Sequence, residues 1–231
     1  MRVLVVTAHP DDIDFGMGGT IAHEVEGGAE VRYVLVTSGQ RGGPDATADP
    51  AAYGHVREAE QRAAAAVLGV TDVRFLGFDD GSLSPWDRAL RVAVAREYRA
   101  FRPDRLMTTH PDQLLTGGFV NHPDHRAVGT VALDCALAYG TTGMVFPELA
   151  IDEGHAAWQG CREVWMSGFG VGDHVVDITA TLERKLTALR LHVSQLADPD
   201  ATMTFMRERM AALGEPHGFP YAESFAVVRR R

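Results

Sequence analysis

Along residues 1–140, segments with the apolar pattern of β-strands alternate with segments that have the apolar pattern of α-helices. Short runs that are rich in β-branched residues and apolar on both faces predict buried strands at residues 2–7, 30–37, 73–76 and 105–108. Longer segments, most of them ended by Gly or followed by Pro, predict helices at residues 20–27, 55–68, 87–101 and 122–139. The alternation predicts an α/β fold: a mostly parallel, doubly wound sheet with helices on both faces.

The pattern becomes less regular after residue 140. Strands are expected at residues 162–166 and 174–178, and a helix at residues 182–195. The length of 231 residues and the apolar fraction of 45% fit a single domain with a substantial core. We therefore expect one domain over residues 1–231, in which residues 1–140 form the core and residues 141–231 complete a cleft.

The amino-acid composition argues against two classes of binding partner, nucleic acids and membranes. The net charge of −9, from 22 Lys+Arg and 31 Asp+Glu, would repel a phosphate backbone, so we expect no nucleic-acid partner. No run of apolar residues is long enough to cross a membrane, and the apolar start is too short for a signal peptide. The two cysteines lie far apart in sequence and suggest no disulfide framework. These features favour a cytoplasmic protein that does not bind membranes.

Polar clusters follow several of the expected strands directly. The segment Thr7–Asp12 follows the first strand, Asp79 and Asp80 follow the third, and His122–His125 comes after the fourth. In doubly wound sheets, ligands bind at the carboxyl ends of the strands. The clusters are therefore expected to meet at one edge of the sheet.

The first and last of these clusters carry metal-binding chemistry. Imidazole nitrogens and carboxylate oxygens are ordinary Zn²⁺ ligands, and three protein ligands plus water make a catalytic site. His9, Asp11 and Asp12 would also make a good solvated turn, and His122–His125 a good helix start. Two such clusters at one end of one sheet favour the metal site.

Other residues are less specific. The glycines of Gly16–Gly19 lack the lysine of a phosphate loop and favour close packing of the backbone. Arg57 would either pair with Glu60 on a helix surface or hold substrate. His110 and His192 are candidate site residues, although each by itself is more typical of a structural histidine.

These motifs together resemble the PIG-L/LmbE-like family of zinc deacetylases. The resemblance extends from about residue 3 to about residue 228 and is most specific in the paired AHPDD and HPDH motifs. Its segments are Ala8–Asp12, Gly18–Thr20, Arg57 with Glu60, Leu68–Val70, Leu76–Gly77, Asp80–Gly81, His122–His125, Val176–Thr179, His192 with Ser194 and Gln195, and Tyr221–Phe225.

The resemblance implies a Rossmann-like fold and hydrolysis of an N-acyl group, usually from an amino sugar. By motif position, His9, Asp12 and His125 would bind zinc. Asp11 would be the general base, and His122 would stabilise or protonate the developing charges. Relatives are often homo-oligomers, so assembly of this chain stays open.

The same resemblance implies roles around the reacting centre. Arg57 and Asp80 would contact hydroxyl groups of the substrate, and Asp124 would orient a histidine ligand. This chain has Asp14 where many relatives have Glu, which keeps the charge but shortens its reach. It also lacks a Tyr that some relatives place just before the second motif, and Tyr221 is one candidate replacement for holding the oxyanion.

Several alternatives remain at this level. Fe²⁺, Co²⁺ or Mn²⁺ could occupy the same ligands, and relatives also cleave thiol S-conjugates and natural-product glycosides. Two histidines and a carboxylate also describe the Fe(II) site of oxygenases, but those usually use an HxD spacing on an all-β fold. A non-catalytic sugar-binding module is the third alternative, against which the extra carboxylate of Asp11 argues.

Overall fold

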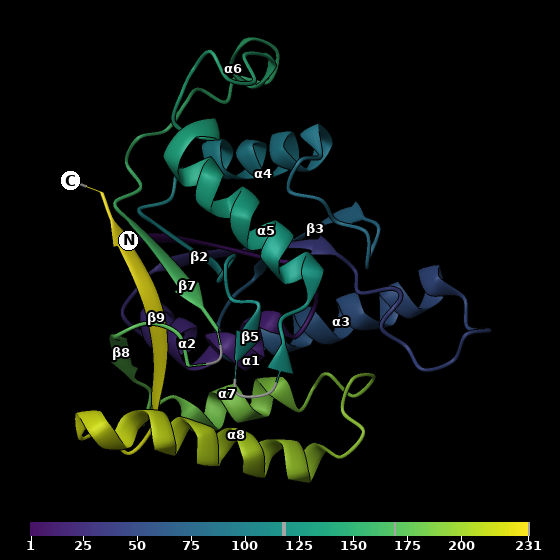
Figure 1. The fold of residues 1–231 in the computed structure, drawn as a ribbon, viewed down its shortest axis with the longest axis vertical. Helices are drawn as coiled ribbons and strands as arrows, with labels where there is room; N and C mark the ends of the chain where they lie inside the picture. The colour runs from purple at the N-terminus through teal and green to yellow at the C-terminus, as the bar shows by residue number, and fades with distance from the viewer. Residues whose placement is uncertain (117–118, 169, 231) are drawn as a thin grey trace.

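The computed structural model describes residues 1–116, 119–168 and 170–230, which form a single α/β domain. At its centre the described residues form a seven-stranded sheet in the order β3-β2-β1-β4-β7-β9-β8 (Figure 1). The first five strands in this order are parallel, and β9 runs antiparallel to both of its neighbours. The strands are β1 (Arg2–Thr7), β2 (Glu30–Thr37), β3 (Asp72–Phe78), β4 (Arg105–Thr109), β7 (Glu163–Ser167), β8 (His174–Asp177) and β9 (Ala222–Arg229). The expected mostly parallel α/β sheet is confirmed.

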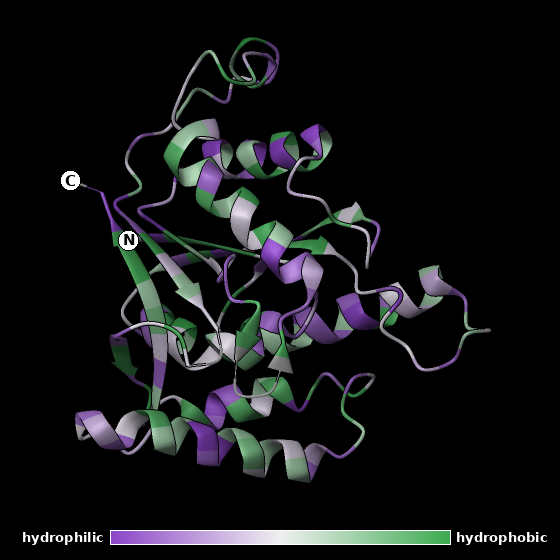
Figure 2. Cartoon of the chain, in the orientation of Figure 1, coloured by the Kyte–Doolittle hydropathy of each residue, from purple (hydrophilic) through white to green (hydrophobic). Residues whose placement is uncertain are grey.

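Helices cover both faces of this sheet because successive strand residues point to opposite sides. Leu4 and Val6 pack under α4 (Arg88–Phe101) and α5 (Pro123–Asp134), which continues as a π-helical turn at Cys135–Tyr139. Val3 and Val5 pack on the other face, against α1 (Asp12–Gly16), α2 (Gly18–Glu26) and α3 (Pro50–Leu68). In Figure 2 the helices carry both green and purple residues, as expected for elements with one buried side.

A further layer lies beyond the second face. Helices α7 (Leu182–Leu189) and α8 (Pro199–Gly214) enclose a third apolar cluster and run beneath α1, α2 and α3 in Figure 1. The helix expected at residues 182–195 ends at Leu189, and neither α8 nor β9 was expected. Yet α8 has a clear local start, because the Asp198 carboxylate accepts a hydrogen bond from the Ala201 amide.

Smaller elements occupy the connections. The connection between β4 and α5 contains the two-stranded ribbon of β5 (Leu115–Thr116) and β6 (Phe119–Val120). A short helix, α6 (Glu148–Ile151), and a 3₁₀ turn at Glu215–His217 complete the described elements. Within the described residues, no helix is both long and apolar enough to cross a bilayer.

The glycine-rich segment after β1 serves close packing, as expected. A side chain at Gly19 would meet Ile178, whose Cδ1 would lie 2.8 Å from the added Cβ. Helix α2 begins at Gly18, two residues earlier than expected, and α1 forms a separate short helix before it. The segment packs tightly against the C-terminal part of the chain.

The strand order places a crevice between β1 and β4. The chain proceeds outward from β1 to β2 and β3, and then returns to add β4 on the other side of β1. The carboxyl ends of β1 and β4 therefore diverge into loops on opposite faces, and such a switch point is where doubly wound sheets bind ligands. His9 follows β1 at this point, and His122 and His125 lie at the start of α5, which follows β4.

Candidate metal centre and cleft

A cleft of about 570 Å³ opens at the carboxyl ends of the parallel strands. It is built from the loops that follow β1, β2, β3, β4 and β7, together with side chains from α3, α5 and α8. The expected site residues that line it are His9, Asp11, Asp12, Arg57, Asp80, His122 and His125. The expected residues outside its lining are Asp14, His110, Asp124, His192 and Tyr221.

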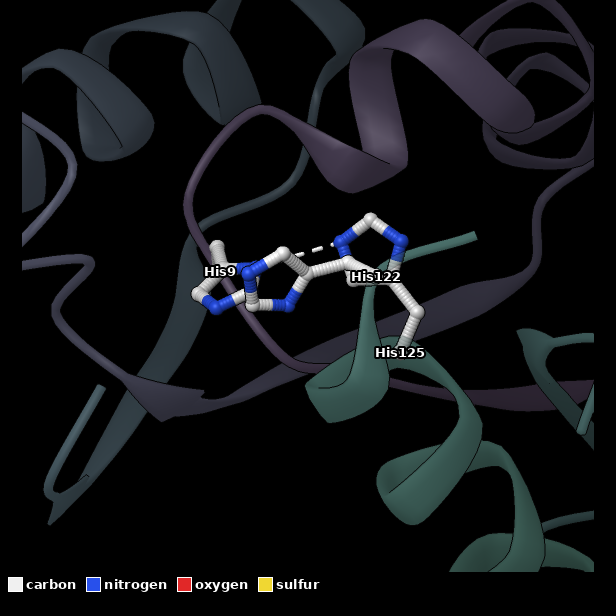
Figure 3. Close-up of side chains that lie close together, drawn as sticks. All are labelled: His9, His122 and His125. Atoms are coloured by element: carbon white, nitrogen blue, oxygen red, sulfur yellow. Dashed lines mark hydrogen bonds between the residues drawn. The ribbon is translucent and has the colours of Figure 1, made fainter. Parts of the chain in front are cut away.

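Donor atoms from three residues, His9, Asp12 and His125, converge in the cleft. The His125 Nε2 atom lies 3.1 Å from His9 Nδ1 and 2.9 Å from Asp12 Oδ1, while His9 Nδ1 lies 3.8 Å from Asp12 Oδ2. Figure 3 shows the His9 and His125 rings meeting from two separate segments of the chain. Tetrahedral zinc places its donors roughly 3.3 Å apart, so this donor set fits such an ion.

In His9 and His125, the ring nitrogen that points away from the other histidine has a hydrogen-bond acceptor beside it, and this acceptor determines which nitrogen carries the ring proton. His9 Nε2 lies 2.9 Å from Asp80 Oδ1 and 3.4 Å from Asp124 Oδ2. His125 Nδ1 lies 3.1 Å from the side-chain oxygen of Asn121. Because carboxylate oxygens only accept, and the Asn121 atom is an amide oxygen, these ring nitrogens carry the protons. The lone pairs of His9 Nδ1 and His125 Nε2 therefore face each other, which is the arrangement of histidines that bind metal.

His122 lies against this pair, but it differs in how its ring nitrogens are hydrogen-bonded. Its ring packs edge-on to His9, with centroids 4.9 Å apart. One ring nitrogen from each of His9, His122 and His125 lies within 4.8 Å of the other two, so the three histidines could also hold a metal ion. However, His122 Nδ1 accepts the backbone amide of Asp124 at 3.2 Å, which leaves the proton on Nε2. Burial and the neighbouring His9 and His125 lower its pKa. His122 is therefore a neutral hydrogen-bond donor, which suits an oxyanion better than a metal.

A second group, formed by His9, Asp80 and Asp124, also brings three ligand atoms together. Its carboxylates are already engaged: Asp80 Oδ2 accepts the Arg41 amide at 2.9 Å, and Asp124 Oδ2 accepts the Gly81 amide at 2.7 Å. The pKa values of both carboxyls are lowered by their hydrogen bonds to His9 and to backbone amides, against the effect of burial. We interpret this group as the support that orients His9, as expected for Asp124.

The charges around His9 favour a bound cation. Burial disfavours a charged ring, but hydrogen bonds to Asp124 and Asp80 and the charge of Asp12 outweigh it and raise the pKa of His9 to about 10. The second proton of the charged ring lies on Nδ1, the nitrogen that faces Asp12 and His125. A metal cation bound at Nδ1 would take the place of this proton, and the same carboxylates would stabilise its charge.

Asp11 and Asp12 are adjacent in sequence but have opposite environments. Burial and the charge of Asp12 raise the pKa of Asp11 to about 6, although Arg57 opposes the shift. Burial also acts on Asp12, but His125 and His9 overcome it and hold the Asp12 pKa far below its usual range. Carboxyls whose pKa values are driven apart in this way suit different tasks, one as a ligand and the other as a proton acceptor.

Arg57 and Asp80 line the cleft, but their polar groups contact protein. Arg57 is buried, and its guanidinium donates to the carbonyls of Gly39 and Pro10, each at 2.8 Å, and to Asp11 Oδ2 at 3.3 Å. The Asp80 oxygens are taken by His9 and the Arg41 amide. These contacts hold the loops of the site, and the expected contacts of Arg57 and Asp80 with substrate hydroxyls stay a prediction.

The remaining candidates lie away from the reacting centre. Asp14 and His192 form a buried pair, 2.8 Å apart, behind the loop that carries Asp11. His110 accepts the Asp112 amide at 3.2 Å and stays outside the cleft lining. Tyr221 packs at the edge of the α7–α8 apolar cluster and lies outside the cleft lining, so its suggested role at the oxyanion, in place of the missing Tyr, stays a prediction. That missing Tyr concerns residues 118–121, of which Gly118 lies outside the described residues.

Two supporting residues were not predicted from the sequence. Asn121 orients His125, and the fully buried Gln61 accepts the backbone amide of Asp11 at 2.8 Å. A signal for Gln61 was present, because it follows Arg57 by one helical turn and thus lies on the same face of α3. The cleft lining also includes Arg41, Gln113 and Arg209, which the sequence did not suggest, and Gln195, which belongs to one of the segments of the family resemblance.

Comparison with known proteins gives one consistent family. The family model described as PIG-L, GlcNAc-PI de-N-acetylase, matches residues 4–136, which is more than half of the chain. The chain therefore belongs to the PIG-L family.

Named relatives of this chain are deacetylases. It is 30% identical to a diacetylchitobiose deacetylase of Thermococcus kodakarensis, over 98% of this chain and 83% of the relative. It is 32% identical to a probable N-acetyl-alpha-D-glucosaminyl L-malate deacetylase 2 of Bacillus cereus, over 84% of this chain and 83% of the relative. The solved structure of an N,N'-diacetylchitobiose deacetylase from Pyrococcus horikoshii superposes with a TM-score of 0.89 at 30% identity, covering 99% of this chain and 84% of that one.

Proposed function

We propose that the chain is a zinc-dependent hydrolase that removes an N-acyl group, with acetyl as the leading candidate, from an amino sugar or GlcNAc-containing conjugate. The observation that carries the proposal is the convergence of His9 Nδ1, His125 Nε2 and Asp12 beside Asp11, a carboxylate left outside the ligand set. Membership of a family whose named relatives are deacetylases supports the same reaction.

The proposed roles follow from the geometry of the side chains. Asp11 accepts a proton from the attacking water, since its raised pKa brings its basicity closer to neutral pH. The Nε2–H of His122 donates to the oxyanion of the tetrahedral intermediate, and Asp11 or His122 then returns a proton to the departing amine. A zinc ion held by His9, Asp12 and His125 would supply Lewis acidity toward the water and the amide carbonyl. The products are a carboxylic acid and a free amine.

The proposed substrate is a small molecule. The relatives named above act on diacetylchitobiose and on an N-acetylglucosaminyl malate, and both compounds present an N-acetylated amino sugar. The cleft of about 570 Å³ has the size of a small-molecule site. A thiol S-conjugate or a natural-product glycoside, cleaved at an amide by the same residues, remains the second candidate.

Two other classes make different use of the site. An Fe(II) oxygenase would need open metal positions and a co-substrate, and it gains nothing from a carboxylate base beside the ligands. A binding module would not need the pKa of Asp11 to differ so strongly from that of Asp12. The deacetylase uses both features, and we therefore favour it.

The decisive experiment measures amine release from N-acetylglucosamine, diacetylchitobiose and N-acetylglucosaminyl conjugates. We expect turnover that is abolished by a chelator and restored by Zn²⁺, with Fe²⁺, Co²⁺ and Mn²⁺ as comparison metals. Failure to release amine from any of these compounds at saturating metal would sink the proposal. Oxoglutarate-dependent oxygen uptake would instead favour the oxygenase.

A further inference from the structure

The backbone at Asp11 is held in an unusual conformation. Its φ of 86° and ψ of −29° lie on the side of the Ramachandran map that residues other than glycine rarely enter. Such a conformation persists only where the surroundings specify it, and it is often found at functional sites. Any contact that fixes this backbone also sets the direction in which the Asp11 carboxylate points.

Helix α3 holds both polar atoms of the Pro10–Asp11 peptide. The Arg57 guanidinium donates to the Pro10 carbonyl at 2.8 Å, and Gln61 Oε1 accepts the Asp11 amide at 2.8 Å. Arg57 and Gln61 are four residues apart and therefore project from the same face of the helix. Two contacts from one rigid helix fix the plane of the peptide and, with it, φ of Asp11.

The orientation of the Gln61 amide is itself fixed from behind. Gln61 Nε2 donates to Asp14 Oδ2 at 3.0 Å, and the same oxygen lies 2.8 Å from His192 Nε2. Gln61, Asp14 and His192 are all fully buried, so water does not compete for these contacts. Because an ionised carboxylate only accepts, the NH₂ group of Gln61 must face Asp14, and its oxygen must face the Asp11 amide.

We propose that Gln61 is a positioning residue for Asp11, oriented by the buried pair of Asp14 and His192. The proposal rests on the proposed function, in which Asp11 is the base. It explains why Asp14 and His192 belong to the site motifs although neither reaches the cleft. It also gives the motif that begins at Arg57 a task, namely to hold one peptide in one orientation.

The first test replaces Gln61 with a residue of similar size that cannot form either hydrogen bond. In Gln61→Leu, kcat should fall roughly 100-fold, because a displacement of the base by about 1 Å has an effect of that order. KM and the bound metal should stay within roughly twofold, since the ligands are untouched. A crystal structure of the variant should show the Pro10–Asp11 peptide rotated away from φ of 86° and the Asp11 carboxylate displaced by about 1 Å.

A matched control separates positioning from general stability. Thr181→Val removes another buried hydrogen bond, from Thr181 Oγ1 to the Gly19 carbonyl at 2.8 Å, without touching the Pro10–Asp11 peptide. It should lower thermal stability by a similar amount and leave kcat unchanged. If Gln61→Leu keeps wild-type kcat, or if φ of Asp11 stays near 86°, the proposal is wrong.

A second test reverses the direction of the hydrogen bond. Gln61→Glu keeps an acceptor for Asp11 but faces the carboxylate of Asp14, so the repulsion should displace it and lower kcat. Adding Asp14→Asn restores a donor: the new amide at position 14 donates to the new carboxylate at position 61 and to the neutral His192 ring. We expect the double variant to regain roughly tenfold in kcat over Gln61→Glu alone.

Absence of this recovery, with both variants folded and metal-loaded, would contradict the proposed role of Asp14. Failure of the proposed function would look different, because the wild-type protein itself would then release no amine from any amino sugar. The Asp11 backbone in the crystal structure of Gln61→Leu would still report on positioning in that case.

Discussion

At the scale of single residues, the chemistry of the site depends on which atom of each side chain carries a proton. The three histidines lie close together, but their second nitrogens have different partners: carboxylates for His9, an amide oxygen for His125 and a backbone N–H for His122. The first two kinds of partner accept a hydrogen bond from the ring, and the third donates one to it. Two rings therefore offer a lone pair to a metal, while the third offers an N–H to the substrate.

Asp11 is the residue whose loss should affect only the chemistry. Asp11→Asn preserves the shape of the side chain but removes the proton acceptor, so kcat should fall by about 10²- to 10⁴-fold. Bound metal, measured by elemental analysis, should stay at the wild-type level, whereas His9→Ala should lose it. Turnover near the wild-type rate in metal-loaded Asp11→Asn would rule out Asp11 as the base.

Asp80 is expected to affect metal affinity by orienting the ring of His9. Asp80→Ala removes the 2.9 Å contact with His9 Nε2, so metal affinity should drop about 10- to 100-fold in a competition titration with a chromophoric chelator. The neighbouring Asp79→Ala is the control, since the Asp79 side chain is 70% exposed. Equal affinities in the two variants would show that Asp80 does not orient the ligand.

At the scale of elements, the site depends on helices that lie behind it. Helix α3 supplies Arg57 and Gln61 to the loop after β1, and the segment that follows α7 supplies His192 to Asp14 at the start of α1. The last strand, β9, adds Glu223, whose carboxylate accepts the amides of Gly19 and Thr20 at the N-terminus of α2. The C-terminal part of the chain therefore fixes the first loop from its buried side.

The contact between α1 and the segment after α7 should make stability depend on pH. Burial disfavours the charged ring of His192, but the hydrogen bond and the charge of Asp14, with smaller contributions from Asp11 and Glu60, raise its pKa above 6.5. Because the folded-state pKa is the higher one, this stabilisation is complete below pH 6.5 and is lost as the pH rises through the folded-state pKa.

Urea unfolding of wild type and His192→Gln measures this contribution. At about pH 6 the wild-type protein should be more stable by about 2 kcal/mol, the strength of a hydrogen bond to a charged group. The difference should shrink by about pH 9. A difference that grows with pH would mean that His192 is neutral in the folded protein throughout this range.

At the scale of the whole molecule, the site joins parts that the sheet separates. Asp12 and His9 follow β1, while His125 belongs to α5, on the opposite face of the sheet from α1. A metal bound by all three would tie these layers together at the switch point and stabilise only the folded state.

Removal of the metal should therefore destabilise the entire domain. With metal at 100 times its dissociation constant, binding contributes about 2.7 kcal/mol, so a chelator should lower Tm by roughly 5–10 °C. Differential scanning calorimetry with and without chelator measures the change. His125→Ala should show the lower Tm both with and without chelator, because it lacks a metal ligand. If the chelator lowered the Tm of this variant as much as that of the wild type, the metal would bind elsewhere.

The strands buried on both faces could be predicted from their own residues. The apolar runs fixed β1, β2 and β4 because a strand buried on both faces leaves an unambiguous pattern. The antiparallel β9 was missed because its last residues are exposed, and α8 because its apolar face is narrow and consists largely of Met203, Met206 and Met210. Both elements are specified mainly by what they pack against, and one segment read alone does not contain that information.

The site divides in the same way. Short motifs determined which side chains follow the strands, because parallel strands all end at one edge of the sheet. The packing of the layers brings Asp80 and Arg57 onto the loops, places Tyr221 in another layer and brings Gln61 to the Asp11 amide. These outcomes depend on the direction and proton of each side chain, which residues distant in the sequence impose when the layers pack together.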